Sequence, residues 1–128
     1  MLSAFLIPEI VVREEGASPA LDVSSSQGKS LTLTLGITRI IEQESLEVSI
    51  WGSADQTSWG AKPLAAFPQK FYCGVYQLPL DLSSHPEIRF VKAQWKVDRW
   101  GRGTPAPLFG IYVVAQETSG SVVTAQSA

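Results

Sequence analysis

The sequence has one cysteine, Cys73, and one histidine, His85, among its 128 residues. A single cysteine excludes a disulfide within the chain, which fits a reducing compartment. One histidine and one distant cysteine do not make a standard zinc site. We interpret Cys73 as a buried thiol and His85 as a surface imidazole, with a Cys–His catalytic pair as the alternative. We expect neither a metal nor another cofactor.

Charged residues are scarce as well, at 17 % of the chain, and the formal net charge at pH 7 is −2. Apolar residues make up 45 % of the chain, which is typical of a globular protein and not of a disordered one. The acidic balance gives no electrostatic reason to expect a nucleic-acid partner. Lys92 and Lys96 share one face of an expected strand and Arg89 takes the other, which indicates a solvated sheet surface.

Long apolar runs are absent, so we expect no membrane insertion. Residues 1–12 are apolar, but Pro8 and Glu9 interrupt them. A basic start and a small-residue cleavage site are missing too, so we expect no signal peptide and predict a cytoplasmic protein or part of an assembled particle. Residues 1–7 are too apolar for a free tail, and we expect them to form the first strand, buried on both sides, or to pack on another subunit.

No segment combines helical periodicity with caps, and alternation with a period of two dominates instead. Apolar side chains occupy every second position within residues 31–37, 46–51, 91–97 and 109–115. Further strands are expected at residues 10–14, 20–23, 64–67 and 75–82, with turn sequences of Gly, Ser and Pro between them. The β-branched residues in 38–45 favour extension, with a turn as the alternative.

About eight short strands at this spacing predict an all-β protein, an antiparallel β-sandwich. A jelly roll of about eight strands is the form that we expect it to take. Residues 1–117 are expected to form this single domain, and residues 118–128, which are mostly small and polar, a flexible C-terminal tail.

Three stretches carry a resemblance to a known family. Residues 53–59 (Ser-Ala-Asp-Gln-Thr-Ser-Trp) lie between two expected strands and resemble the Ser-x-Asp-Gly-x-x-Trp hairpin of discoidin-like (galactose-binding-like) jelly rolls, with Gln56 where the family usually has glycine. Residues 88–95 resemble the Arg-Tyr-Val-Arg strand of that family, and residues 103–109 resemble its small phage-virion-associated members. The resemblance implies a binding or structural module that does not catalyse by itself.

Two loops carry candidate ligand-binding side chains. Arg99, Trp100 and Arg102 lie in one of them, where an exposed indole offers a flat face to a sugar or partner and arginines offer donors to carboxylate or phosphate. The alternative is a tryptophan folded over the end of the sandwich. Asp55 and Trp59 are the other candidates, against the alternative that Asp55 binds backbone amides of its own turn while Trp59 covers the hairpin base.

No nucleophile, base and orienting group can be named together, and the carboxylates are scattered, so we expect no enzyme. A calcium site made of loop acids and carbonyls is an open alternative. Our leading hypothesis is a non-enzymatic structural subunit, similar to small phage virion components. It would form a homo-oligomer or larger assembly through strand faces, edges and terminal arms. The alternative is a carbohydrate- or surface-binding module that uses residues 99–103, together with Trp51 or Trp59.

Overall fold

The computed structural model describes residues 2–41, 43–100 and 107–118, and in this part of the chain nearly all regular structure is β. The strands are β1 (Ser3–Val12), β2 (Gly16–Ala17), β3 (Leu21–Asp22), β4 (Ser30–Arg39), β5 (Glu44–Ser53), β6 (Ala65–Ala66), β7 (Gly74–Asp81), β8 (Phe90–Arg99) and β9 (Phe109–Glu117). Two single-turn 3-10 helices are η1 (Ser24–Ser26) and η2 (Leu82–Ser84). No helix within the described ranges has the length and apolar character needed to cross a membrane. The all-β class is confirmed.

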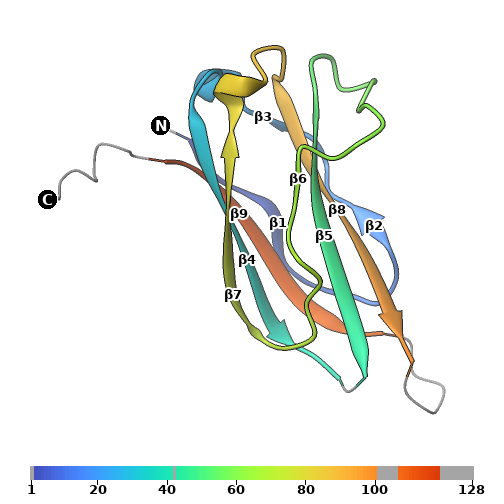
Figure 1. Cartoon of the computed structure of the whole chain (residues 1–128). Coiled ribbons are helices and arrows are strands. Elements are labelled where there is room, and N and C mark those ends of the chain that lie inside the picture. Colours follow the sequence, from blue (N-terminus) through green and yellow to red (C-terminus); the bar gives the residue numbers. More distant parts are fainter. Residues whose placement is uncertain (1, 42, 101–106, 119–128) are drawn as a thin grey trace, which may run out of the picture.

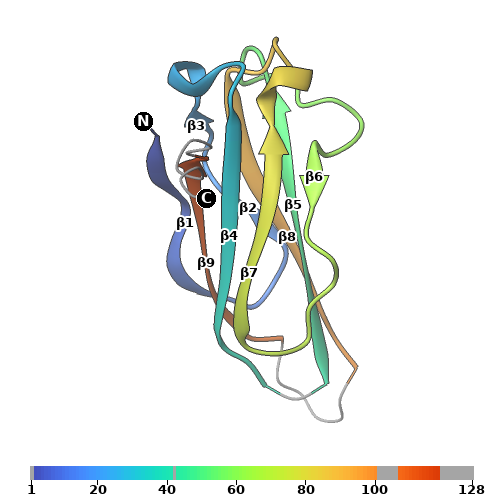
Figure 2. The ribbon, with the colours of Figure 1, turned by 60° about the vertical axis from the view of Figure 1, so that its left-hand side comes forward.

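Two antiparallel sheets pack face to face as a sandwich (Figure 1 and Figure 2). One sheet has the order β1-β9-β4-β7, and the other has the order β2-β8-β5-β6 with β3 also paired to β8. The partners are nested along the chain: β1 pairs with β9, β2 and β3 with β8, β4 with β7, and β5 with β6. Nested pairs wrapped into two sheets make a jelly roll, so the predicted sandwich is confirmed.

The core lies between the two sheets and comes from alternate residues of the long strands. Successive side chains of a strand point to opposite faces, so one apolar series from each strand is buried. The inward series are Leu31, Leu33, Leu35 and Ile37 on β4, Phe109, Ile111, Val113 and Ala115 on β9, Leu46, Val48 and Ile50 on β5, and Val91 and Ala93 on β8. These are the alternating positions that the sequence predicted.

The apolar N-terminal segment forms β1, an edge strand that pairs with β9 alone. The strand is longer than the predicted residues 10–14 and contains register shifts between Phe5 and Ile7 and between Ile7 and Ile10. Ile7 is buried, but Phe5 is 57 % exposed. The first-strand expectation is confirmed, whereas burial on both sides is wrong, because only the inner face of β1 packs against the core.

Three local expectations change. Cys73 is exposed in the loop before β7, so its interpretation as a buried thiol is wrong. The turn alternative holds between β4 and β5, where Gln43 has a φ of 60° in the left-handed region. The predicted turn around Gly16 contains β2, because Gly16 pairs with Trp95 of β8.

Candidate functional site

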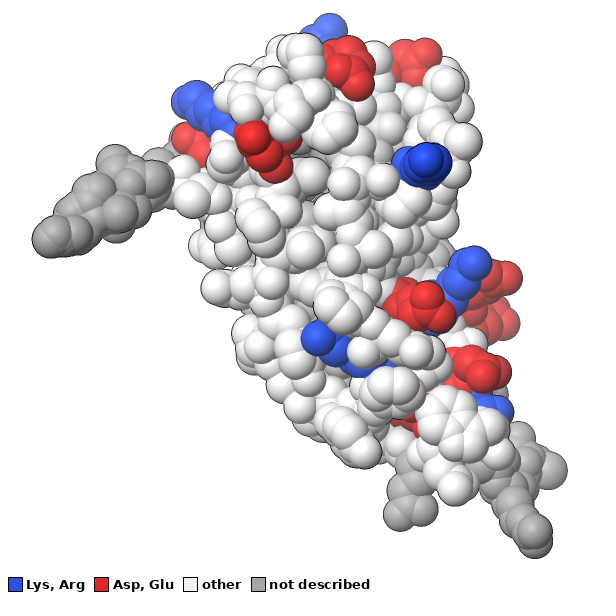
Figure 3. All heavy atoms as spheres, in the orientation of Figure 1, with Lys and Arg blue, Asp and Glu red and all other residues white. Residues whose placement is uncertain are grey.

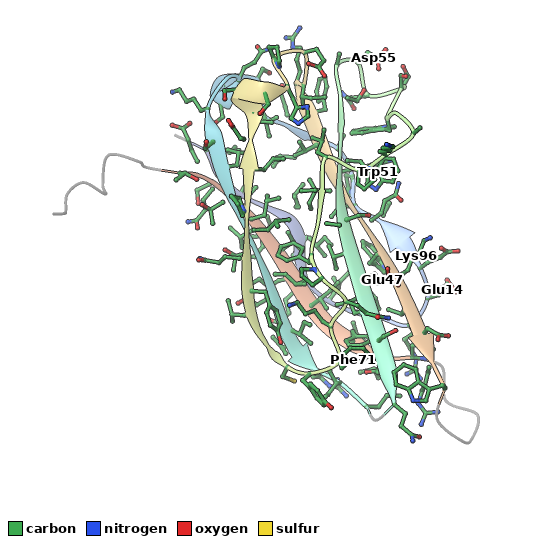
Figure 4. All side chains as sticks on the ribbon, in the orientation of Figure 1. Glu14, Glu47, Trp51, Asp55, Phe71 and Lys96 are labelled. Carbon is green, nitrogen blue, oxygen red and sulfur yellow. The ribbon has the colours of Figure 1, made fainter. Side chains whose placement is uncertain are left out.

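The residues predicted to bind a ligand lie at opposite ends of the sandwich. Asp55 and Trp59 belong to the loop that follows β5, at the top of Figure 1, and Asp55 is labelled there in Figure 4. Arg99 ends β8 at the opposite end, and Trp100 follows it. Arg102 lies outside the described residues. The described candidates therefore do not form one site.

Asp55 shapes its own turn. Its Oδ1 atom accepts hydrogen bonds from the backbone N–H groups of Ser58 and Thr57 at 3.0 and 2.9 Å, and from the Ser53 hydroxyl at 2.9 Å. These hydrogen bonds, that from the Ser58 N–H first among them, hold the pKa of the Asp55 carboxyl well below its usual value. Gln56 adopts a φ of 69°, so the chain makes this turn with glutamine where the family motif has glycine.

Trp59 folds back over the same loop. Its indole Nε1 donates to the carbonyl of Gln56 at 3.2 Å, and Lys92 Nζ lies 4.5 Å from the centroid of its ring. A lysine ammonium above an aromatic face is a favourable cation–π contact. These contacts agree with the alternative in which Trp59 covers the hairpin, and a ligand role for Asp55 or Trp59 stays a prediction.

Arg99 and Trp100 are neighbours in sequence but line different hollows. Arg99 lines a hollow of about 620 Å³ over β5 and β8. Other charged residues around this hollow are Arg13, Glu14, Glu15, Glu47, Lys96 and Asp98. Glu47 and Lys96 face each other across the two strands, and Figure 4 labels both. Because both positively and negatively charged residues line this hollow, it favours neither an anion nor a cation.

Trp100 lines a second hollow, of about 520 Å³, that three chain segments build together. They are the connection between β4 and β5, the loop before β7 and the end of β8. The lining residues are Ile40, Ile41, Gln43, Glu44, Phe71, Tyr72 and Trp100, which we call the aromatic pocket. The rings of Phe71 and Trp100 meet edge to face with centroids 6.1 Å apart, and Trp100 N donates to Gln43 O at 3.0 Å.

Phe71 and Tyr72 belong to no motif or alternating run in the sequence, so they were not among the predicted site residues. Both follow Lys70 in a stretch without strand alternation, and they are 39 % and 72 % exposed. Two adjacent aromatic residues in a loop are the signal that points to them, because an isolated loop seldom exposes two rings without a partner.

Glu44 lines the aromatic pocket, and its carboxylate accepts hydrogen bonds from backbone N–H groups of the protein itself. The side chain is 1 % exposed. Its Oε2 accepts from the backbone N–H of Ile41 at 2.9 Å, and its Oε1 accepts from the backbone N–H of Leu108 at 2.7 Å. Charge-assisted hydrogen bonds to backbone amides are strong, so Glu44 ties the connection between β4 and β5 to the segment that enters β9.

Other carboxylates also serve local structure. Asp22 and Asp81 each accept hydrogen bonds from the hydroxyl and backbone N–H of a nearby serine, and Glu117 accepts from Ser26. These contacts lower the pKa of all three carboxyls. Over the described ranges, no three His, Cys, Asp or Glu residues gather where they could hold a metal ion.

The outer face of the β1-β9-β4-β7 sheet is built from uncharged residues along nearly its whole length. The alternation and register of the strands place on it Ser3, Phe5, Val11, Thr32, Thr34, Gly36, Thr38, Val75, Gln77, Pro79, Gly110, Tyr112, Val114 and Gln116, which we call the uncharged face. Phe5, Val11 and Val75 are 57 %, 47 % and 63 % exposed. Two charged residues lie at the ends of this face, Asp81 opposite Ser30 at one end and Arg39 opposite Gly110 at the other.

The outer face of the other sheet differs in character. Its strands β5 and β8 place Glu47, Lys92 and Lys96 on that side, with Glu47 opposite Lys96 and Lys92 opposite Trp51. Figure 3 shows this difference: charged side chains gather along the right of the view, over β5 and β8, while the left, where β4 and β7 lie, is mainly uncharged. The molecule therefore has one charged and one uncharged sheet surface.

No protein-family model and no curated protein matches the chain. Among solved structures, a chain in the structure of the Gt strain of infectious bursal disease virus is similar, with a TM-score of 0.55 and 10 % sequence identity. A chain in the structure of the Gx strain has a TM-score of 0.53 and 11 % identity.

These two matches cover 91 % and 92 % of this chain but 32 % and 33 % of the viral chains. The chain thus spans about a third of the length of the viral chains that it resembles. At this identity the likeness shows a shared fold, and it supports the jelly roll. The finer resemblance to discoidin-like domains finds no support in these comparisons.

Proposed function

We propose that this protein is a non-enzymatic structural subunit that assembles with copies of itself into a particle, as a virion component does. The observation that carries the proposal is the uncharged face, which covers one side of a jelly roll and exposes Phe5, Val11 and Val75. The shared fold with chains of infectious bursal disease virus supports a particle as the setting. Contiguous exposed apolar surface commonly marks a protein–protein interface.

A second copy of the chain suits this face on electrostatic grounds. Two copies that meet through the middle of the uncharged face, between Asp81 and Arg39 at its ends, bring no like charges together there, and like charges across an interface cost several kcal/mol. The same patch on both subunits gives the isologous contact of a two-fold dimer, the commonest oligomer symmetry. The charged face that carries Glu47, Lys92 and Lys96 is left toward solvent in such a pair.

The area of the face is close to what such an interface needs. The strands β4 and β9 contain 10 and 9 residues. With a rise of about 3.3 Å per residue and four strands about 4.8 Å apart, the face measures roughly 30 Å by 19 Å, or about 600 Å². A specific interface of standard size takes about 800 Å² from each partner. The face therefore supplies about three quarters of that area.

Edge-to-edge strand pairing fits this protein less well than face packing. Both edges of the β1-β9-β4-β7 sheet contain proline, at Pro8 in β1 and at Pro79 in β7. Proline removes a backbone donor, and the register shifts of β1 disturb its edge further. The opposite sheet has only two-residue strands at its edges, β2, β3 and β6. We therefore assign self-association to the face.

Light scattering after size exclusion, followed by negative-stain microscopy of the same fraction, tests this proposal. We expect the wild-type protein at about 100 μM to have a mass of two or more 13.9 kDa chains. Val75→Glu places a charge on the uncharged face and should return the protein to the monomer, because an unpaired charge in an interface is costly. Ala66→Glu is the matched control, since Ala66 is an exposed residue in the edge strand of the other sheet.

A wild-type monomer at that concentration would overturn the proposal. So would a Val75→Glu variant that assembles as the wild type does, provided that both variants keep the β-sheet circular dichroism of the wild type. A closed ring or shell under the microscope supports the particle role.

A further inference from the structure

We infer that two copies of the chain pack antiparallel through the uncharged face, with Asp81 of each copy against Arg39 of the other. This inference rests on the proposed function, because it takes self-association through that face as given and assigns the orientation of the second copy. The two charged residues at the ends of the face carry it, since their signs decide between the two ways in which the face can meet itself.

Asp81 and Arg39 mark opposite ends of the uncharged face. Asp81 is the last residue of β7 and lies opposite Ser30 at the start of β4, whereas Arg39 is the last residue of β4. Figure 1 shows the end of β7 at the top of the sheet and the end of β4 at the bottom. Both side chains are exposed. The 10 residues of β4 separate the two ends by about 30 Å, at about 3.3 Å per residue. The face therefore has one acidic and one basic end.

Both charges are available to a partner. Asp81 Oδ1 accepts hydrogen bonds from the hydroxyl and the backbone N–H of Ser83 at 2.6 and 2.9 Å, while Oδ2 has a longer contact of 3.4 Å with the Ser84 hydroxyl. The bonds from Ser83 lower the pKa of Asp81, so its carboxylate is ionised at neutral pH. The guanidinium of Arg39 offers a planar fork of donors that matches a carboxylate.

One of the two possible arrangements brings like charges together. A two-fold axis between two packed faces lies in the interface and runs either along the strands or across them. An axis along the strands lays β4 of one copy over β9 of the other and keeps both copies the same way up. The two Arg39 residues then lie on neighbouring strand positions, only about 5 Å apart sideways. Like charges placed against each other weaken an interface, so this parallel arrangement is disfavoured.

The other arrangement brings opposite charges together. An axis across the strands turns the second copy upside down and lays β4 over β4 and β7 over β7. The basic end of one copy then covers the acidic end of the other, and Arg39 lies one strand, or about 4.8 Å, to the side of Asp81. The two-fold axis makes this contact twice. Complementary charges fix the register of an interface, and here they select the antiparallel pair.

Charged residues beside the face leave this choice standing. Lys29 precedes Ser30, but its Nζ lies 3.6 Å from a carboxylate oxygen of Glu117, with which it forms an ion pair. Glu9 is exposed in the irregular part of β1, and the antiparallel pair sets its two copies at the same rim. Because β1 is an edge strand, water and salt screen the two carboxylates there, and their repulsion is small.

Cysteine cross-linking in a Cys73→Ser background distinguishes the two orientations. Gln77 lies opposite Thr34 at the middle of the face, so the antiparallel axis places it beside its own copy, whereas the parallel axis sets the two about 14 Å apart sideways. Thr38 lies near the end of β4, where the parallel axis sets its copies about 5 Å apart and the antiparallel axis more than about 20 Å apart. We expect bis-maleimidoethane to cross-link Gln77→Cys into a dimer and to leave Thr38→Cys as single chains.

Charge reversal tests the ion pair itself. Arg39→Glu sets an acid against Asp81 twice in each dimer, so it should raise the dissociation constant in sedimentation equilibrium by about tenfold or more. Adding Asp81→Arg to this variant should return the constant to within about threefold of the wild type, because the pair is restored with its signs exchanged. Lys62→Glu is the matched control, since it replaces a cation by an acid in the exposed loop after β5, and it should change the constant by less than about twofold.

A cross-linked Thr38→Cys dimer would overturn the inference, as would cross-linking at both positions or at neither. Dimerisation of Arg39→Glu at the affinity of the wild type would also overturn it, and so would a doubly reversed variant that keeps the native circular dichroism but binds no better than Arg39→Glu. If the doubly reversed variant does not fold, the cross-links decide. In all these cases a dimer that Val75→Glu dissociates leaves the proposed function intact, whereas a wild-type monomer overturns both.

Discussion

The ring of Tyr112 on β9 lies directly across Gly36 on β4, its partner in the neighbouring strand. A Cβ atom added at Gly36 would lie 2.1 Å from two carbon atoms of that ring. Tyr112 also meets Phe5 of β1 edge to face, with centroids 6.5 Å apart. A glycine on β4 thus lets one aromatic side chain lie flat and span three strands of the uncharged face.

Gly36→Ala is therefore expected to displace the Tyr112 ring. We expect a loss of about 1–3 kcal/mol in the free energy of unfolding, the usual cost of inserting a group into a packed site. Urea unfolding measures it. In a Tyr112→Ala background the same Gly36→Ala substitution should cost much less, because the clash is gone. Equal costs in the two backgrounds would contradict the assigned contact.

Glu44→Gln should destabilise the fold although it conserves shape. The amide nitrogen of glutamine cannot accept a hydrogen bond, so the N–H of Ile41 or Leu108 loses its acceptor. A buried donor left without a partner costs about 1–3 kcal/mol, which should appear as a lower urea midpoint. Glu47→Gln, three residues further along β5 on its exposed face, should change stability by less than about 0.5 kcal/mol. Similar losses in both variants would argue against the special role of Glu44.

Asp55 is expected to stabilise the fold in a pH-dependent way. Its pKa is lowered from the usual 3.8 because the N–H groups of Ser58 and Thr57 bind the carboxylate in the folded state. This contribution is complete above the usual pKa and is lost as the pH falls below it. Asp55→Asn should lower the urea midpoint at neutral pH, and its difference from the wild type should shrink from about pH 4 downward. A difference that stays constant across this range would contradict the linkage.

Cys73 should react with a thiol reagent in the folded protein, because its side chain is exposed in the loop before β7. We expect one thiol per chain to titrate with Ellman's reagent in native buffer, at a rate that rises less than about tenfold on adding denaturant. Cys73→Ser supplies the blank. A thiol that reacts only after unfolding would show that the loop covers it.

The long strands were predictable because each has one buried face. In β4, β5 and β9 the alternation of apolar and polar residues predicts which side chains are buried in the core. Among the two-residue strands, β3 and β6 lie within the predicted residues 20–23 and 64–67. β2 was missed, because it falls in a predicted turn and is defined by its partner across the sheet. Residues 1–7 and 10–14 were treated as separate segments, and their union in β1 was missed because Pro8 and two register shifts break the alternation.

The candidate sites were predictable only in part, for a different reason. Trp100 was singled out as a candidate ligand-binding residue, and its side chain is exposed, but its binding role stays a prediction. Its neighbour Phe71 comes from a loop far away in sequence, and only the nested strand order brings the two rings together. The uncharged face has the same origin, since four strands from different parts of the chain supply it. A linear sequence shows the members of such a surface but not their adjacency.

The pairing of β1 with β9 has a consequence for folding during synthesis on the ribosome. Ser3 lies opposite Gln116, and β9 is also the inner neighbour of β4. β1 leaves the ribosome before β9 has been synthesised. The β1-β9-β4-β7 sheet can therefore form in full only after β9 has emerged. Jelly rolls of such high contact order fold in about milliseconds to seconds. A polypeptide that ends before β9 would leave β1 without a partner in the sheet and β4 paired with β7 alone.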